Sequence, residues 1–132
     1  MFGTARPLAA AATRYRQVDV DSRVEGASPH HLVMILFEEL LKACDAVVTA
    51  IDRGDAARET QRRARATALL HGLETSLDFD RGGEIALNLA RIYREARRLL
   101  DEPGGTRRAA ARQAREMLAE IAGAWSDMRA AA

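Results

Sequence analysis

Residues 28–52 read SPHHLVMILFEELLKACDAVVTAID, and this stretch decides the fold. The Ser28 side chain can cap a helix start, and Pro29 suits the first helical position because its missing N–H has no helical partner there. At about 100° per residue the apolar side chains cover roughly half of the helix circumference, more than a surface helix needs. The reliably polar strip contains only Glu38, Lys42, Asp45 and Thr49. We therefore predict a helix over residues 29–53 that is covered on several sides.

Three further helices are expected, at residues 56–77, 84–102 and 107–129. Gly54 favours the end of one helix and Asp55 the start of the next. A turn over residues 78–83 and the Pro-Gly-Gly break at residues 103–105 separate the later helices. Helices of about 20 residues joined by short turns are antiparallel neighbours. The sequence thus predicts an all-α fold, an antiparallel up-down four-helix bundle over residues 28–132.

The last two helices show apolar stripes at helical spacing. In the third helix the stripe consists of Ile85, Leu89, Ile92, Ala96, Leu99 and Leu100, with Tyr93 at its edge. Thr106 is placed to cap the fourth helix, whose own stripe includes Met128. These stripes supply the surfaces against which the first helix packs.

Residues 1–27 are expected to form an N-terminal arm or short helix ahead of the bundle. An alanine cluster at residues 9–12 favours a short helix, and the following alternation of valine and aspartate has no visible strand partner. We interpret the second part as an extended strap. Its apolar anchors are Tyr15, Val18 and Val20.

Composition excludes several functional classes. The chain has 20 basic and 19 acidic residues, a formal net charge of +1, so no long-range field that recruits nucleic acid or an anionic membrane is implied. Cys44 is the single cysteine and cannot form an internal disulfide, which fits a reducing compartment. No apolar run reaches about 18 residues, and no secretory signal is evident. We expect a cytoplasmic protein without membrane insertion.

Catalytic, cofactor and metal sites are not expected. His30 and His31 lie in the first turn of a helix, where solvated histidines are common. His71 follows Ala68 by three residues, so the Glu-x-x-His motif of di-iron bundles is missing. One cysteine and three scattered histidines provide no zinc spacing.

Two arginine clusters leave alternatives open: Arg58, Arg62 and Arg65, and then Arg107, Arg108, Arg112 and Arg115. Positive charge at a helix N-terminus opposes the helix dipole, which can mark an acidic partner or an anion site. The simpler interpretation is a solvated face. A nucleic-acid-binding helical module using these arginines is the alternative function, although interleaved aromatic residues are absent. A small helical enzyme with a hidden site is a third class, and it lacks catalytic residues.

The order of several motifs resembles the flagellin export chaperone family, FliS. The arm tyrosine is followed by Ala-Ser-Pro at residues 27–29, Leu77-Asp78, Gly82-Gly83, Tyr93 and a late Trp125. The chain departs from the family at Phe37, where a Tyr-Asp-Gly sequence is frequent. The resemblance implies a non-enzymatic cytoplasmic chaperone that binds the disordered C-terminal segment of flagellin, prevents premature polymerisation and assists type III export with an export gate component.

The resemblance also implies which residues meet the client. In the family the N-terminal arm can lie over the hydrophobic groove, so Tyr15, Val18 and Val20 are expected to shield it and to limit weak self-association of the client-free chain. The client surface is expected at the edges of the apolar arc of the first long helix and on the third helix: Ile35, Phe37, Leu41, Val48 and Tyr93. Ordinary core packing is the alternative for each of these side chains, and most of all for Phe37.

Overall fold

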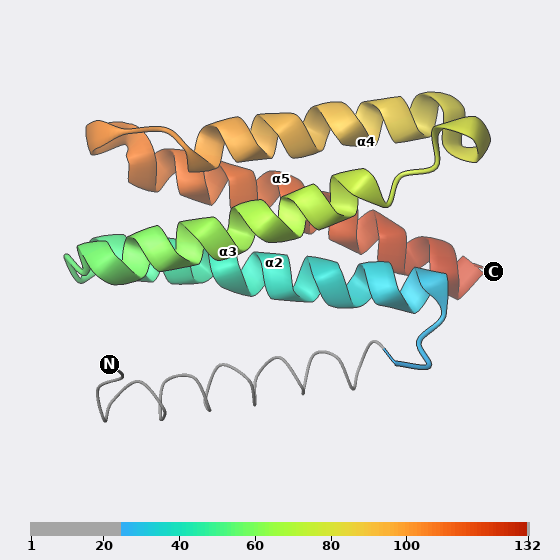
Figure 1. Cartoon of the computed structure of the whole chain (residues 1–132), viewed down its shortest axis with the longest axis horizontal. Helices are drawn as coiled ribbons and strands as arrows, with labels where there is room; N and C mark the ends of the chain where they lie inside the picture. Colours follow the sequence, from blue (N-terminus) through green and yellow to red (C-terminus); the bar gives the residue numbers. More distant parts are fainter. Residues whose placement is uncertain (1–24, 132) are drawn as a thin grey trace, which may run out of the picture. The chain divides into compact units, whose positions relative to one another are not determined.

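The structure is a computed structural model that describes residues 25–131 (Figure 1). Within these residues the elements are α2 (Pro29–Asp52), α3 (Ala56–Thr75), α4 (Phe79–Leu100), a single 3-10 turn η1 (Gly104–Thr106) and α5 (Arg107–Ala131). The described part contains no strand. The chain divides into two units, residues 1–35 and 36–132, and the second contains most of α2 and all of α3, α4 and α5.

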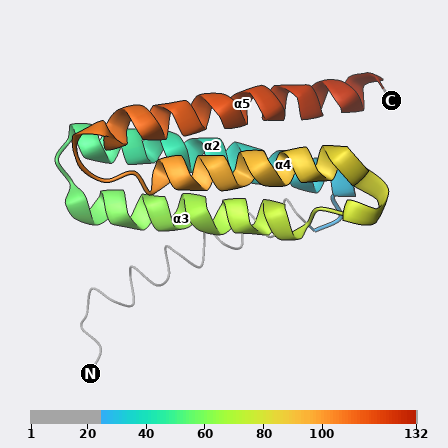
Figure 2. The ribbon, with the colours of Figure 1, turned by 90° about the horizontal axis from the view of Figure 1, so that it is seen from above.

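Helices that follow one another in sequence run antiparallel and lie side by side in the second unit (Figures 1 and 2). α4 packs against both α3 and α5. Ion pairs described below join α2 to α3 and to α5. The predicted all-α, up-down four-helix bundle is confirmed, and the arm predicted over residues 1–27 lies almost entirely outside the described residues.

The start of α2 follows the local sequence. The Ser28 Oγ accepts a hydrogen bond from the backbone N–H of His31 at 3.1 Å, and the Ser28 carbonyl accepts one from Leu32 at 2.9 Å. Pro29 is the first helical residue. The predicted N-cap and first position are both confirmed.

The junction of α2 and α3 is a Schellman motif followed directly by an N-cap. Gly54, at φ 67°, donates to the Ile51 carbonyl at 3.1 Å, and Asp55 donates to the Ala50 carbonyl at 3.0 Å. The Asp55 carboxylate then accepts from the Arg58 N–H at 3.0 Å. Two adjacent residues thereby end one helix and begin the next, which fixes the antiparallel return.

α4 begins earlier than predicted, at Phe79 rather than Glu84. The Asp78 carboxylate caps this start by accepting from the N–H groups of Asp80 and Arg81, both at 3.1 Å. Gly83 then leaves helical geometry, with φ 48° and ψ −124°. The regular helix after this kink begins where predicted, whereas residues 79–82, which were predicted to be part of a turn, form a further turn of helix.

The core contains small and branched side chains from all four helices. Those that are completely buried include Leu40, Val47, Ala66, Leu70, Ala96, Leu100, Ala111, Ala114 and Leu118. In the first half of α4 the core-facing residues are Ala86 and Ala90, whereas Ile85 is 70% exposed. The prediction that Ile85 belongs to the buried stripe is wrong, and Tyr93, predicted at the edge, is buried.

Two half-buried carboxylates tie α3 to its neighbours. Glu74 of α3 accepts from Arg94 at 2.9 Å and pairs with Arg97 at 3.2 Å, both on α4. Glu59 accepts from Arg63 on its own helix at 3.0 Å and from Arg107 of α5 at 3.1 Å. These bonds clamp the bundle near both of its ends.

Arg63 also donates to the carbonyl of Leu100, the last residue of α4. Helix C-termini leave carbonyls without helical partners, so a guanidinium there satisfies one of them. Thr106 was predicted to cap α5, but within the described residues no backbone N–H donates to its hydroxyl, which itself donates to Glu102 at 3.5 Å. The helices of residues 25–131 do not combine the length and apolar composition that a bilayer span requires.

Candidate partner-binding surface

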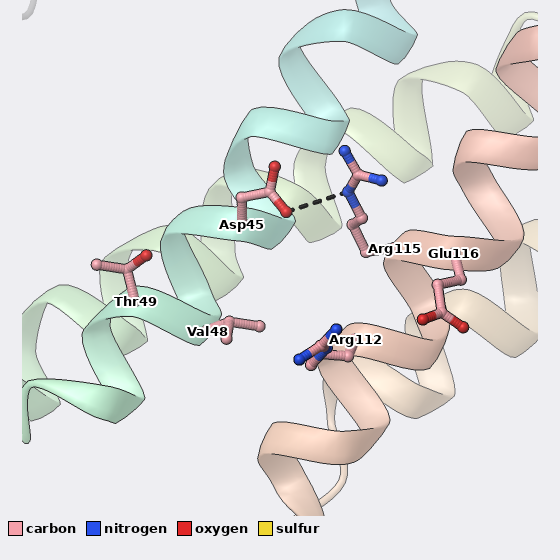
Figure 3. A pocket seen from close by; sticks show the side chains of 6 residues that line it. All are labelled: Asp45, Val48, Thr49, Arg112, Arg115 and Glu116. Atoms are coloured by element: carbon pink, nitrogen blue, oxygen red, sulfur yellow. Dashed lines mark hydrogen bonds and ion pairs between the residues drawn. The ribbon is translucent and has the colours of Figure 1, made fainter.

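A cleft opens between α2 and α5 in the bundle (Figure 3). Its volume is about 400 Å³, and three residues of each helix line it: Asp45, Val48 and Thr49 of α2, and Arg112, Arg115 and Glu116 of α5. The lining combines one apolar side chain with both signs of charge. Such a composition suits a peptide side chain better than an apolar small molecule.

Two ion pairs fix the register of α2 against α5. Arg108 donates to Asp52 through Nε at 2.6 Å and through Nη2 at 3.1 Å, a bidentate pair. Seven residues further along α5, Arg115 donates to Asp45 at 3.1 Å. The Arg108 hydrogen bond holds the pKa of Asp52 below its usual value, with a smaller contribution from the charge of Arg112.

Arg112 lies between these two pairs without a carboxylate of its own. Within the part of the chain that the structure describes, it makes no hydrogen bond or close ion pair. The antiparallel register places it opposite Val48, and Figure 3 shows its guanidinium pointing toward the α2 side of the cleft, where Thr49 also lies. The cleft therefore offers one guanidinium without a close carboxylate partner, beside the apolar side chain of Val48.

The predicted client residues of α2 and α4 fall into two groups. Leu41 and Val48 are partly exposed. In contrast, Ile35, Phe37 and Tyr93 are buried, and burial raises the pKa of Tyr93 to about 12. Only the first two side chains are available to a partner without rearrangement, and the role of all five remains a prediction.

The predicted anchors of the arm, Tyr15, Val18 and Val20, lie outside the described residues. Their role as a cover for the client surface is likewise a prediction.

Four large apolar side chains of the described residues are exposed, and the sequence did not predict their exposure. These are Phe79 at 46%, Ile85 at 70%, Leu87 at 50% and Met128 at 59% exposure. Three of them belong to the first three turns of α4, around the kink at Gly83. The Gly82-Gly83 pair was the available signal, since consecutive glycines mark a break that can change which residues face the core.

Within residues 25–131 no group of three or more histidine, cysteine, aspartate or glutamate side chains could hold a metal ion. Cys44 is fully buried, and burial, with a smaller effect of Asp45, raises the pKa of its thiol to about 12.

Comparison with known proteins places the chain in a family. The family model described as flagellar protein FliS matches residues 11–132. The flagellar secretion chaperone FliS of Salmonella typhimurium is 34% identical over 116 residues, which cover 86% of each chain. The flagellar secretion chaperone FliSB of Pseudomonas aeruginosa is 32% identical over 63% of this chain and 66% of its own.

The flagellar secretion chaperone FliS of Vibrio cholerae is 30% identical over 60% of this chain and 58% of its own length. The match to the family model covers the whole bundle and part of the preceding residues. The chain therefore belongs to the FliS family of flagellar secretion chaperones.

Proposed function

We propose that this chain binds the C-terminal segment of flagellin in the cytoplasm, prevents its premature polymerisation and assists its type III export together with a component of the export gate. The observation that carries this proposal is the family match over residues 11–132, supported by relatives named flagellar secretion chaperones. No catalytic role is part of the proposal.

The bundle offers surfaces that suit such a client. A segment that becomes ordered on binding loses conformational entropy, and burial of apolar area must offset this loss. An amphipathic helix laid into a groove provides that area. The α2–α5 cleft with Val48, the neighbouring Leu41, and the exposed apolar side chains of α4 are the described surfaces of this kind.

We propose Leu41 and Val48 as the first contacts, because both are partly exposed in the client-free chain. Ile35, Phe37 and Tyr93 are buried, so contact with the client requires that it displaces a covering element. Substitution of Leu41 by serine should weaken client binding with a small loss of stability. A Phe37→Ala variant should lose stability first, whether or not it also loses binding.

Tyr15, Val18 and Val20 are proposed to cover the client surface when no client is bound. Deletion of residues 1–20 should then raise self-association of the client-free protein, measured by light scattering. An unchanged monomer distribution in the truncated protein would contradict this role.

Co-purification with flagellin tests the central proposal. The chain should retain full-length flagellin from the same genome and lose it when the C-terminal segment of flagellin is removed. Failure to retain full-length flagellin, or retention that ignores the truncation, would contradict the proposal.

The alternative of a nucleic-acid-binding module gains no support from the arginine clusters. Arg58 and Arg65 pair with Asp55 and Glu39, and the bonds of Arg107, Arg108 and Arg115 to carboxylates are given above. Guanidinium groups that already hold carboxylates are less available to phosphates. Binding to DNA or RNA that falls steeply with salt would revive this alternative.

A further inference from the structure

Two ion pairs join α2 to α5, and the arginine of α5 that lies between them has no acidic counterpart on α2. Asp52 meets Arg108 at one end and Asp45 meets Arg115 at the other. The position between them on α5 is Arg112, and its counterpart on α2 is Val48 rather than an acidic residue. Val48 and Arg112 both line the cleft of about 400 Å³, so a carboxylate of a bound partner can reach Arg112 there.

We propose that Arg112 anchors an aspartate or glutamate side chain of the bound client, and that the α2–α5 cleft receives that acidic side chain together with an apolar neighbour. The inference rests on the proposed function, since it takes the C-terminal segment of flagellin as the client. It adds a residue and a client chemistry that apolar surface alone does not specify.

The flanking pairs prepare Arg112 for this role. Asp45 and Asp52 are each engaged by another arginine, so neither neutralises Arg112 by direct contact. Glu116, one turn further along α5, lines the same cleft and makes no close ion pair with Arg112 within residues 25–131. A guanidinium held beside the Val48 wall can form a two-bond pair with an incoming carboxylate, and charge-assisted pairs of this kind are the stronger hydrogen bonds.

The register also defines the spacing that the client needs. Leu41 precedes Val48 by two helical turns on the same side of α2, and its counterpart on α5 is the partly exposed Ala119. Seven residues of helix span about 10.5 Å. A client helix that follows this groove should therefore carry an acidic residue at Arg112 and an apolar residue about two turns away.

The first part of the test compares Arg112 with a matched arginine elsewhere. Arg91 of α4 is exposed and makes no ion pair within the described residues. Affinity for the purified C-terminal segment of flagellin is measured by calorimetry for the wild-type chain and for Arg112→Gln, Arg112→Glu, Arg91→Gln and Arg91→Glu. We expect about a tenfold loss for Arg112→Gln, a larger loss for Arg112→Glu, and changes under about twofold for both Arg91 variants.

The second part of the test introduces a carboxylate on α2, at the cleft that Arg112 lines. Thr49 lines the same cleft and is adjacent to Val48 in sequence, so Thr49→Glu adds a carboxylate to the α2 side of the cleft that competes with the client for the guanidinium. Client affinity should fall by about tenfold while the melting temperature stays at or above that of the wild type. Thr49→Gln is the control, because it has the same size without the charge and should bind the client like the wild type.

The outcomes separate the two proposals. If the wild type binds the segment and the affinity is unchanged in Arg112→Gln, Arg112→Glu and Thr49→Glu, the anchoring role of Arg112 is overturned. The proposed chaperone function is not affected by that outcome. Equal losses at Arg112 and Arg91 would show a general charge effect and also overturn the anchoring role. No binding of the segment by the wild type would overturn the proposed function and this inference together.

Discussion

The ring centroids of Phe37 and Tyr93 lie 6.4 Å apart, with the ring planes inclined at 52°. Phe37 belongs to α2 and Tyr93 to α4, two helices that do not follow one another in sequence, and both side chains are almost fully buried. Tilted aromatic pairs at this separation stabilise by about 0.5–1.5 kcal/mol beyond their buried area. The pair therefore joins non-consecutive helices through the core.

Truncation of the Phe37 ring should lower stability strongly, whereas removal of the Tyr93 hydroxyl should change it little. Phe37→Ala removes a buried ring and should lower the free energy of unfolding by about 3–5 kcal/mol, measured by urea denaturation. Tyr93→Phe keeps the ring contact and, since the hydroxyl makes no hydrogen bond within the described residues, should change stability by less than about 0.5 kcal/mol. A Phe37→Ala variant as stable as the wild type would show that the ring is not part of the core.

Two glycines should respond to alanine in opposite directions. Gly54 ends α2 at φ 67°, a conformation that costs a residue with a Cβ roughly 1 kcal/mol. Gly123 lies inside α5, and an added Cβ would meet nothing within 4 Å. We expect Gly54→Ala to destabilise by about 1 kcal/mol and Gly123→Ala to stabilise by about 0.5–1 kcal/mol in thermal unfolding. A Gly54→Ala variant at least as stable as the wild type would contradict the cap geometry.

The Cys44 thiol should be nearly inert in the folded chain. Burial raises its pKa from 9.0 to about 12, so at pH 8 the thiolate is about a thousandfold scarcer than in the unfolded chain. Because Cys44 is the single cysteine, the release of thionitrobenzoate from Ellman's reagent reports on this site alone. Reaction should be slow in buffer and immediate in guanidinium chloride. Comparable rates in both solutions would show that α2 opens readily around Cys44.

The helix ends of this fold were readable from sequence because their signals are local. Ser28 caps α2 through a residue three positions away, and Gly54 and Asp55 end one helix and start the next through bonds of similar range. The start of α4 could not be predicted from such local signals. Gly82-Gly83 indicates a break, but it does not show that a further helical turn, capped by Asp78, precedes that break.

The face of α4 could not be chosen from periodicity alone. Ile85 and Ala86 begin two adjacent stripes with the same helical spacing, and the bulkier stripe was the natural choice. The bundle instead places Ala86 and Ala90 inside, because small residues let helices approach closely, and it leaves Ile85 outside. Tyr93 lies on the same stripe as Ala86 and Ala90 and is buried with them.

The partners of the α5 arginines were beyond local reasoning altogether. Arg108 meets Asp52 across 56 residues of sequence, and Arg115 meets Asp45 across 70. A cluster of arginines near a helix start is compatible with a solvated face, an anion site or interhelical pairs. Only the packing of α2 against α5 shows which guanidinium groups are engaged and that Arg112 is not.

Acid should weaken the clamp that Glu59 forms with Arg63 and Arg107. Burial opposes the charged carboxylate, but the hydrogen bonds from Arg63 and Arg107 outweigh it and lower the pKa below the ordinary 4.5. Between the two pKa values the unfolded chain therefore holds more protons, so stability rises with pH in that window. The contribution of Glu59 is complete above pH about 4.5 and is lost as the pH falls through the lowered folded value.

Comparison of the wild type with Glu59→Gln across pH isolates this contribution. The wild type should be more stable at pH 7, and the difference in the free energy of unfolding, measured with urea, should shrink steadily below pH about 4.5 because the protonated carboxyl no longer holds the arginines. Glu120→Gln is the matched control, since Glu120 is exposed on α5 and forms no ion pair within residues 25–131. Its difference from the wild type should be small and independent of pH. A Glu59→Gln difference that stays constant from pH 7 down to pH 3 would show that the clamp does not stabilise the bundle through the charge of Glu59.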